Sequence, residues 1–221
     1  MYCKKNFIKF LVEKKVLAFG QFVTKSGRKT PYFFNMGKIN TALSLSSLAD
    51  AYCDLIIKHF GPEIDNVFGP AYKGIPLSVM VAHKLSKRLK KDISFTFDRK
   101  EKKDHGEGGI LIGHEYSGQE RVIVVEDVLT SGISLVQTAS ILKGYKITPL
   151  GAVLGINRQE KVDATNRFDF PIHSLLSVHE VLNYVLNSDV SALRINNPIE
   201  IKEKIKKYLS SFGSSAVVNS Q

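Results

Sequence analysis

One stretch of sequence decides the fold of this 221-residue chain: Val122-Ile123-Val124-Val125-Glu126-Asp127-Val128-Leu129-Thr130-Ser131-Gly132-Ile133-Ser134. Its four apolar residues predict a buried strand, and a turn rich in hydroxyls and glycine then leads into a helix. In open α/β sheets, ligands bind at the carboxyl ends of strands, where a helix N-terminus and successive N–H groups form an anion site. Carboxylates accept hydrogen bonds from hydroxyls but repel phosphate. We therefore expect vicinal hydroxyls of a ligand at Glu126 and Asp127, and its phosphate over residues 128–134.

Strands and helices alternate on both sides of this stretch. Apolar runs predict strands at 67–68, 93–97, 121–125, 150–156 and 172–176. Helical patterns are predicted at 43–60, at 75–90, and from the turn after the central strand to about residue 143. This alternation is typical of an α/β fold in which a mostly parallel sheet is flanked by helices.

The two ends of the chain have other patterns. Residues 4–17 place apolar side chains on one helical stripe, and two aromatic-rich runs within 19–35 surround a glycine turn and predict a β-hairpin. An amphipathic helix is predicted at 198–209. We expect three parts: an N-terminal helix and hood over residues 1–40, an α/β core over 41–210, and a disordered tail over 211–221.

Residues 98–109 contain no apolar side chain, so this segment has no face to bury. We predict a mobile loop. A solvated surface loop is the ordinary interpretation of such a run. Its glycine-rich end, Gly106-Glu107-Gly108-Gly109, and its position between strands favour a lid that closes over a site.

The charge balance indicates anionic partners. The chain has 31 Lys and Arg against 21 Asp and Glu, which gives a formal net charge of +10, suited to nucleic acid, an acidic membrane or phosphorylated small molecules. No apolar run approaches the roughly 18 residues that a membrane span needs, and no helix-turn-helix, RNA-binding or zinc-finger motif is present. Cys3 and Cys53 form no metal-binding pattern. We therefore expect a cytoplasmic protein with reduced thiols and small anionic ligands, and neither a nucleic-acid nor a membrane partner.

Four motifs, in order along the chain, resemble those of one enzyme family. The 122–134 stretch resembles the 5-phosphoribosyl 1-pyrophosphate (PRPP) motif of type I phosphoribosyltransferases, although Ile133 stands where many relatives have a small residue. Residues 19–22, 25–28 and 30–35 resemble the hood of the orotate phosphoribosyltransferases. Residues 68–76 match their pyrophosphate loop and 98–108 their catalytic loop. The resemblance is greatest to the bacterial, single-function form.

The resemblance implies the type I phosphoribosyltransferase fold, with an N-terminal hood that contains a β-hairpin. It implies transfer of the 5-phosphoribosyl group from PRPP to orotate, which gives orotidine 5′-monophosphate and pyrophosphate in pyrimidine biosynthesis. The implied PRPP-binding residues are Lys25, Tyr72, Lys73, Arg99, Lys100, Lys103, His105, Glu126, Asp127, Val128, Leu129, Thr130, Ser131, Gly132, Ile133 and Ser134. The implied catalytic residues are Lys100, Lys103, His105 and Asp127. The implied orotate-binding residues are Lys25, Phe33, Phe34, Thr130 and Arg158.

The resemblance also implies a cofactor and an assembly. Mg²⁺ is expected to bridge pyrophosphate and ribose hydroxyls, with no direct protein ligand other than the one candidate, Asp127. The family generally forms homodimers in which the catalytic loop reaches the partner's site, so Lys100 and its neighbours are expected to act in trans.

Several simpler interpretations stay open at this stage. Adjacent strand residues point to opposite faces, so Phe33 or Phe34 is expected in the core. His105 alone is most often an exposed histidine, and Arg158 alone is most often a helix cap or part of an ion pair. Glu126 and Asp127 alone would most often cap a surface helix. The alternative functions are a phosphoribosyltransferase for another base and a PRPP-sensing regulator.

Overall fold

The computed structural model describes residues 3–23, 27, 29–103, 109–159, 168–187 and 197–212. Its strands are β1 (Leu17–Val23), β2 (Lys29–Phe34), β3 (Asn66–Phe68), β4 (Ser94–Lys103), β5 (Gly109–Gly113), β6 (Val122–Leu129), β7 (Gly151–Asn157) and β8 (Ile172–Ser177). Its helices are α1 (Lys4–Glu13), the short 3-10 helix η1 (Met36–Lys38), α2 (Ala42–Phe60), α3 (Gly74–Leu89), α4 (Ile133–Gly144), α5 (Val178–Asn187) and α6 (Pro198–Phe212).

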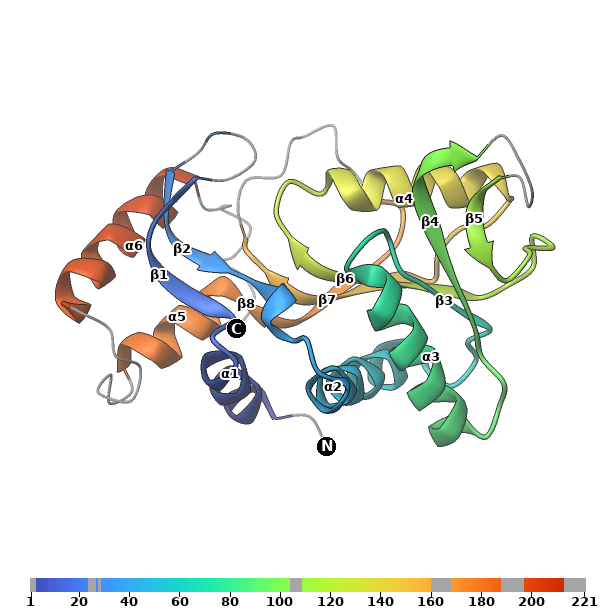
Figure 1. The fold of residues 1–221 in the computed structure, drawn as a ribbon, viewed down its shortest axis with the longest axis horizontal. Helices are drawn as coiled ribbons and strands as arrows, with labels where there is room; N and C mark the ends of the chain where they lie inside the picture. Colours follow the sequence, from blue (N-terminus) through green and yellow to red (C-terminus); the bar gives the residue numbers. More distant parts are fainter. Residues whose placement is uncertain are drawn as a thin grey trace.

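Six strands form the central sheet, in the order β5-β4-β3-β6-β7-β8. All neighbouring pairs are parallel except β4 and β5, which are antiparallel. The sheet is therefore mostly parallel and flanked by helices, as the alternating pattern predicts. Figure 1 shows α2 and α3 on one face of the sheet and α4 on the other.

The strand residues alternate between two hydrophobic layers. Ile123 and Val125 pack in the cluster that includes α2 and α3, whereas Val122 and Val124 pack in the cluster that includes α4. Residues 122–125 are inaccessible to solvent because β6 is covered on both faces, which is why this strand is continuously apolar.

A smaller layer covers one end of the sheet. The hairpin of β1 and β2 pairs antiparallel, and α1, α5 and α6 gather around it (Figure 1). The hood predicted at the N-terminus is therefore completed by helices from the C-terminal end of the chain. None of the helices in the described ranges is long and apolar enough to cross a bilayer.

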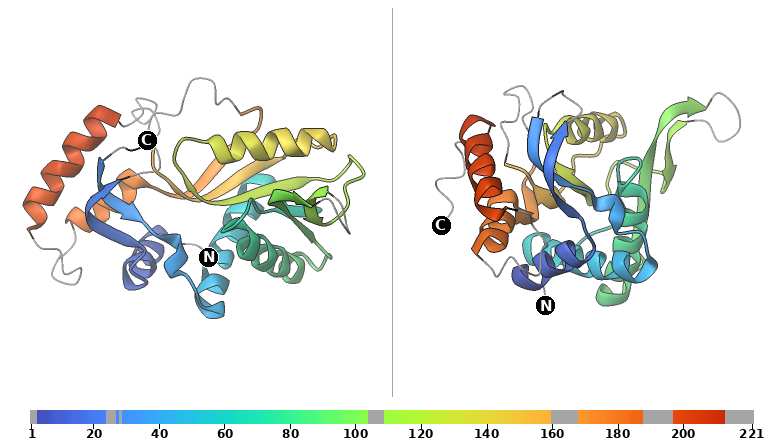
Figure 2. Two further views of the ribbon diagram at one scale, coloured as in Figure 1. Left: turned by 45° about the horizontal axis from the view of Figure 1, so that its top comes forward. Right: turned by 60° about the vertical axis from the view of Figure 1, so that its left-hand side comes forward.

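The structure corrects several predicted boundaries. Strand β4 continues through residues 98–103 and β5 begins at Gly109, so much of the predicted 98–109 loop is a two-stranded arm; residues 104–108 lie outside the described part. Figure 2 shows this arm projecting from the body of the molecule. Pairing between β4 and β5 holds this arm, and Asp98, Arg99 and residues 109–112 are half-buried in it. Strand β6 continues to Leu129, so the acidic pair lies within the strand rather than at its end.

Three further differences concern the helices. Helix α1 ends at Glu13 rather than near residue 17, and Lys15 has a left-handed φ of 54° just beyond it. Helix α5 was not predicted. Helix α6 runs to Phe212, two residues into the predicted tail; residues 213–221 lie outside the described part.

Candidate active site

Glu126 lies near the carboxyl end of β6 and is largely buried. The Ser134 hydroxyl donates a hydrogen bond of 2.6 Å to its Oε2 atom, and the Tyr52 hydroxyl donates one of 2.7 Å to its backbone oxygen. Burial raises the pKa of Glu126 to about 7; the hydrogen bond from Ser134 acts in the opposite direction, and the neighbouring charge of Asp127 adds to the rise. This carboxyl group can therefore exchange a proton near neutral pH.

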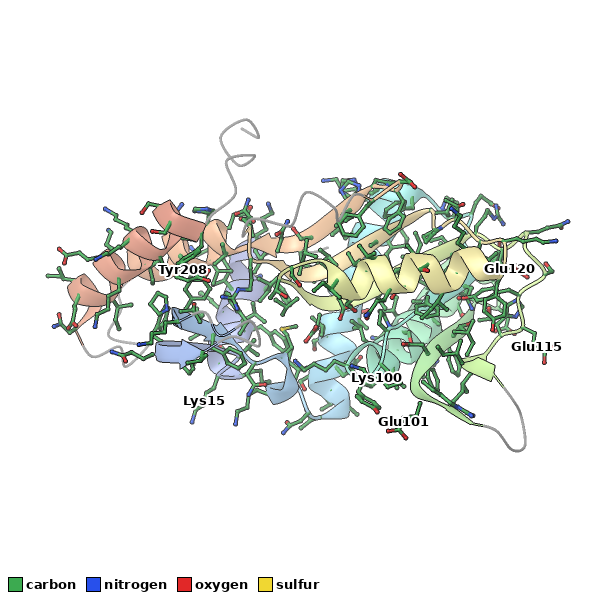
Figure 3. The ribbon with its side chains drawn as sticks, turned by 90° about the horizontal axis from the view of Figure 1, so that it is seen from above. Lys15, Lys100, Glu101, Glu115, Glu120 and Tyr208 are labelled. Atoms are coloured by element: carbon green, nitrogen blue, oxygen red, sulfur yellow. The ribbon has the colours of Figure 1, made fainter. Side chains whose placement is uncertain are left out.

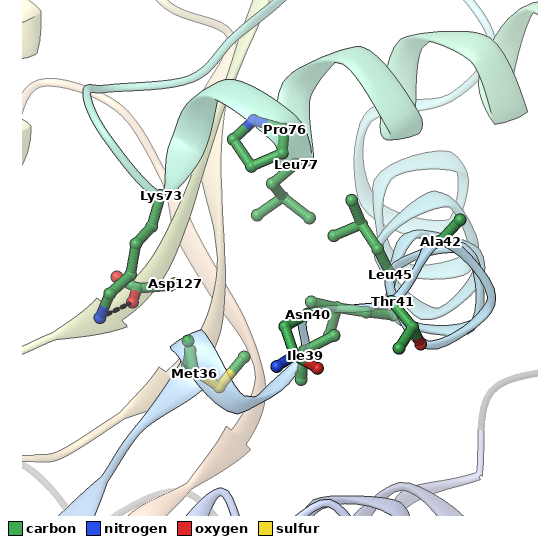
Figure 4. A pocket seen from close by; sticks show the side chains of 12 residues that line it. Met36, Ile39, Asn40, Thr41, Ala42, Leu45, Lys73, Pro76, Leu77 and Asp127 are labelled. Atoms are coloured by element: carbon green, nitrogen blue, oxygen red, sulfur yellow. Dashed lines mark hydrogen bonds and ion pairs between the residues drawn. The ribbon is translucent and has the colours of Figure 1, made fainter.

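Asp127 points to the other face of the strand and meets a second motif. The Lys73 ammonium group lies 2.9 Å from its Oδ2 atom, and the backbone N–H of Val128 donates a hydrogen bond of 2.8 Å to its Oδ1 atom. Figure 4 shows this ion pair at the edge of a pocket. The predicted pyrophosphate loop and the predicted acidic pair therefore come together at one edge of the sheet.

The pyrophosphate loop, residues 69–74, is a tight turn between β3 and α3. A Cβ atom on Gly69 would lie 2.0 Å from the backbone oxygen of Gly74, and one on Gly74 would lie 2.6 Å from the carbonyl carbon of Gly69. Both positions therefore require glycine, because any side chain would force the two ends of the turn apart. The Asp98 carboxylate accepts a 2.6 Å hydrogen bond from the backbone N–H of Ala71.

Lys100 lies against the pyrophosphate loop of its own chain. Its ammonium nitrogen is 5.5 Å from the centroid of the exposed Tyr72 ring, a cation–π distance. The strand continuing beyond residue 97 carries Lys100 and Asp98 toward this loop on one face, because alternate strand residues share a face. This contact lies within one chain, and the expectation that Lys100 acts in trans stays a prediction.

The other residues predicted on the arm are placed differently. Arg99 follows Asp98 on the opposite face, and one terminal nitrogen of its guanidinium group is buried with no hydrogen-bond partner among the described residues. Lys103 ends β4, where it pairs with Gly109, but its side chain lies outside the described part, as does all of His105.

The turn from β6 into α4 has the shape expected of an anion site. Gly132 has a left-handed φ of 80° and immediately precedes the first residue of α4. Around it the side chains of Thr130, Ser131 and Ile133 are exposed. Side chains and helix N-terminus together leave a surface on which a phosphate can rest.

Arg158 follows the end of β7 and is buried. Its backbone N–H donates a 3.2 Å hydrogen bond to the oxygen of Leu129, which places it beside the turn after β6. Its Nη2 atom lies 3.4 Å from the Thr30 hydroxyl, and its guanidinium carbon is 5.0 Å from the centroid of the Tyr32 ring. The hood hairpin therefore reaches the edge of the sheet at this arginine.

The two predicted hood aromatics have different environments. Phe34 is buried in the main core, whereas Phe33 is 38% exposed and stacks on Phe22 with ring centroids 5.5 Å apart. Phe33 is thus the member of the pair that a ligand can contact, as strand alternation predicts. Lys25, the remaining predicted hood residue, lies outside the described part.

A pocket of about 300 Å³ adjoins the Lys73–Asp127 ion pair. It lies between η1 and the N-terminal ends of α2 and α3 (Figure 4). Its lining is mostly apolar and includes Ile39, Leu45 and Leu77. The ion pair supplies the charged end of this hollow.

Some supporting residues were not predicted. Asp98 lies within a motif singled out from the sequence but was given no role. Tyr52 and Gly155 support the acidic pair from below, since a Cβ atom on Gly155 would lie 2.7 Å from the backbone oxygen of Asp127 and 2.8 Å from the Tyr52 hydroxyl. No local pattern marks Tyr52 or Gly155, because their importance comes only from packing across the sheet.

The side chains fit a divalent cation carried by a ligand rather than one held by the protein. The described residues contain no group of three or more His, Cys, Asp or Glu side chains that could hold a metal ion. Of the two acidic residues, Asp127 is the one whose carboxylate faces the pyrophosphate loop. Lys73 already neutralises the charge of this carboxylate. A metal here needs most of its oxygen ligands from a phosphorylated substrate.

The doubly covered sheet and its paired anion loops define a phosphoribosyl transferase domain, and the family model of that description matches residues 43–172. The chain is 41% identical to an orotate phosphoribosyltransferase of Clostridium botulinum, over 96% of this chain and 98% of that protein. It is 36% identical to one of Kluyveromyces lactis, over 96% of both chains. The chain belongs to the orotate phosphoribosyltransferase family.

Solved structures agree with this assignment. The crystal structure of orotate phosphoribosyltransferase from Francisella tularensis has a TM-score of 0.75 and 33% identity, over 95% of this chain and all of that one. A Mycobacterium tuberculosis orotate phosphoribosyltransferase in complex with PRPP has a TM-score of 0.60 and 16% identity, over 80% of this chain and 98% of that one. The second comparison shows the shared fold.

Proposed function

We propose that this protein is an orotate phosphoribosyltransferase, which converts orotate and PRPP to orotidine 5′-monophosphate and pyrophosphate in the cytoplasm. The observation that carries the proposal is the 2.9 Å contact between Lys73 and Asp127. It joins a tight glycine-bounded loop to an acidic pair beside a phosphate-binding turn. That combination suits a substrate with a pyrophosphate at one end, vicinal hydroxyls in the middle and a phosphate at the other.

The chemistry follows from these positions. The bond from ribose C1 to pyrophosphate breaks, the new bond to a ring nitrogen of orotate forms at the same carbon, and the proton of that nitrogen is released to solvent. The ribose becomes positively charged as pyrophosphate leaves, so the acidic pair stabilises the sugar and Lys73 stabilises the leaving group. Lys100, above Tyr72, adds a second cation on the pyrophosphate side.

The residues proposed to bind orotate lie on the opposite side of the turn between β6 and α4. Phe33 offers an exposed aromatic face, Thr130 a hydroxyl, and Arg158 a planar guanidinium group that matches a carboxylate. We extend the assignment to Lys25 on the resemblance alone. Asp127 is the one protein carboxylate proposed to approach a Mg²⁺ ion carried by PRPP, and such an ion would supply neutralising charge for the leaving pyrophosphate.

We propose a homodimer in which the arm serves both sites. Lys100 acts within its own subunit, whereas Arg99, Lys103 and His105 act on the partner. The projecting arm in Figure 2 and the contact of Lys100 with Tyr72 of its own chain support this division. A Lys73→Ala protein mixed with a Lys103→Ala protein should recover activity after subunit exchange, because one site of each heterodimer is intact. Mixing Lys73→Ala with Lys100→Ala should recover none, and recovery there would place Lys100 in trans.

The decisive experiment is an absorbance assay for loss of orotate. Loss that requires orotate, PRPP and Mg²⁺ together supports the proposal, and competition with adenine, hypoxanthine and uracil tests the base. PRPP binding by calorimetry without loss of orotate would favour another base or a regulatory role. No binding of PRPP would reject the assignment of the acidic pair.

A further inference from the structure

Three buried side chains form a continuous column from the C-terminal helix to the edge of the active site. The ring of Tyr208, on α6, meets the ring of Tyr32 edge-on, with centroids 5.7 Å apart and planes at 85°. The guanidinium carbon of Arg158 lies 5.0 Å from the centroid of the same Tyr32 ring. All three residues are nearly inaccessible to solvent. Figure 3 shows Tyr208 on the helix at one end of the molecule.

The column is one of several contacts that hold Arg158. Its backbone is tied to Leu129 at the end of β6, and its Nη2 atom lies 3.4 Å from the Thr30 hydroxyl, which itself donates a 3.0 Å hydrogen bond to the backbone oxygen of Tyr32. The ring of Tyr32 is therefore the surface on which the planar end of Arg158 rests. Edge-to-face geometry restricts the tilt of that ring, so Tyr208 restricts the plane of the guanidinium group.

This arrangement differs from ordinary core packing in two respects. A charged side chain is the third member of the column, and an aromatic face attracts a cation directionally as well as excluding water. The support also comes from α6, which lies beyond residues 43–172, the part that matches the phosphoribosyl transferase domain model. The support from Tyr208 therefore lies outside the part of the chain that matches the phosphoribosyl transferase domain model.

We propose that Tyr208 is a positioning residue for orotate binding, acting through Tyr32 on the orientation of Arg158. The inference rests on the proposed function, because it takes Arg158 as the partner of the orotate carboxylate. A bidentate pair with a carboxylate needs a fixed guanidinium plane. Loss of the Tyr208 ring therefore weakens orotate binding while leaving the pyrophosphate side of the site, built by other segments, intact.

The test compares Tyr208→Leu with Tyr208→Phe in steady-state kinetics. Tyr208→Leu should raise the KM for orotate on the order of tenfold, with the KM for PRPP changed less than about twofold, because one substrate loses a positioned partner. Tyr208→Phe keeps the ring and should restore the KM for orotate. If Tyr208→Leu does not fold, Tyr208→Met replaces it, since a thioether fills similar space without a ring.

Ile205→Ala is the matched control. Ile205 is a buried residue of the same helix, in the same core, and its truncation lowers the melting temperature without removing a member of the column. It should leave the KM for orotate unchanged. An equal rise in that KM for Ile205→Ala, or an unchanged KM for a folded Tyr208→Leu protein, would overturn the proposal.

A second readout separates positioning from general support. In an Arg158→Ala background, Tyr208→Leu should cause no further rise in the KM for orotate, because the residue through which it acts is gone. A full additional effect would overturn the proposal. A wild-type enzyme that does not consume orotate would reject the proposed function itself, whereas normal wild-type kinetics with an unaffected Tyr208→Leu protein would reject only the role of Tyr208.

Discussion

The loops proposed to face phosphate are each built from one short segment, whereas the arginine proposed to face orotate is held by segments from both ends of the chain. Gly69 and Gly74 close their turn within six residues, and Gly132 shapes the turn before α4. Arg158 instead depends on the hairpin and, through Tyr32, on α6. Under the proposed function, PRPP is bound by compact motifs, whereas the side of the site that selects the base is assembled by tertiary packing.

The largest effect is expected from Gly69→Ala, which tests whether the phosphate side tolerates any distortion. The new Cβ atom would lie 2.0 Å from backbone of the same turn, and displacement of catalytic groups by about 1 Å costs about 100-fold in rate. We expect kcat/KM to fall by at least that factor. Gly144→Ala is the control, because a Cβ atom there meets nothing within 4 Å. Near-normal activity of Gly69→Ala would contradict the close approach.

Asp127→Asn should have the next largest effect. The fold stays intact, since the amide keeps an oxygen for the Val128 N–H, but the negative charge beside the ribose and the ion pair with Lys73 are lost. We expect kcat to fall on the order of 100-fold, comparable to loss of one preorganised electrostatic group. The measurement is steady-state kinetics, with circular dichroism to confirm the fold. Wild-type kinetics would remove this carboxylate from the mechanism.

A smaller effect is expected at Asp98, which links the arm to the pyrophosphate loop. Asp98→Ala removes the acceptor for the Ala71 N–H and should raise the KM for PRPP by roughly tenfold, the size of one lost charge-assisted hydrogen bond. Asp98→Asn keeps an oxygen acceptor and should recover most of this loss. A change in the KM for orotate alone would contradict this prediction, because it would place the effect of Asp98 on the orotate side of the site and not on the pyrophosphate loop.

The smallest effect concerns pH and the carboxyl group of Glu126. The pKa of Glu126 in the folded protein is raised to about 7 from an ordinary 4.5. Between pH 4.5 and pH 7 the folded protein therefore keeps a proton on this carboxyl group that the unfolded chain has lost. The contribution of Glu126 to the free energy of unfolding therefore falls as pH rises from about 4.5 to 7, and it is smallest above pH 7. Glu126→Gln should raise the melting temperature of the substrate-free protein more at pH 8 than at pH 5. The exposed Glu115→Gln serves as control, and equal shifts at both pH values would contradict the burial effect.

The sequence predicted most of the α/β core because periodicity is a local property. The buried strand at 122–125 and the helix ending before Gly61 follow from apolar runs and a breaker. The arm was harder to predict, because residues 98–103 have no apolar side chain and only their place in β4, which pairs with β5, shows that they are extended. Helix α5, which was not predicted, packs on β8 and α1.

For the site, sequence motifs identified Lys73 and Asp127 but not their contact. The prediction for the hood aromatics needed the structure to decide that Phe34 is core and Phe33 exposed. Tyr52 and Gly155 could not be recognised, since neither belongs to a local pattern.

The sequence by itself determined the order of strands and helices, the family resemblance and the residue types at the phosphate loops. Those properties depend on short segments whose backbone geometry their own glycines and hydroxyls favour. Only the tertiary structure decided that Lys73 meets Asp127 and that Lys100 lies on its own Tyr72. It also decided that Tyr208 reaches Arg158 through Tyr32. Such contacts join residues far apart in the chain, and they form only when the hydrophobic layers bring the segments that carry them together.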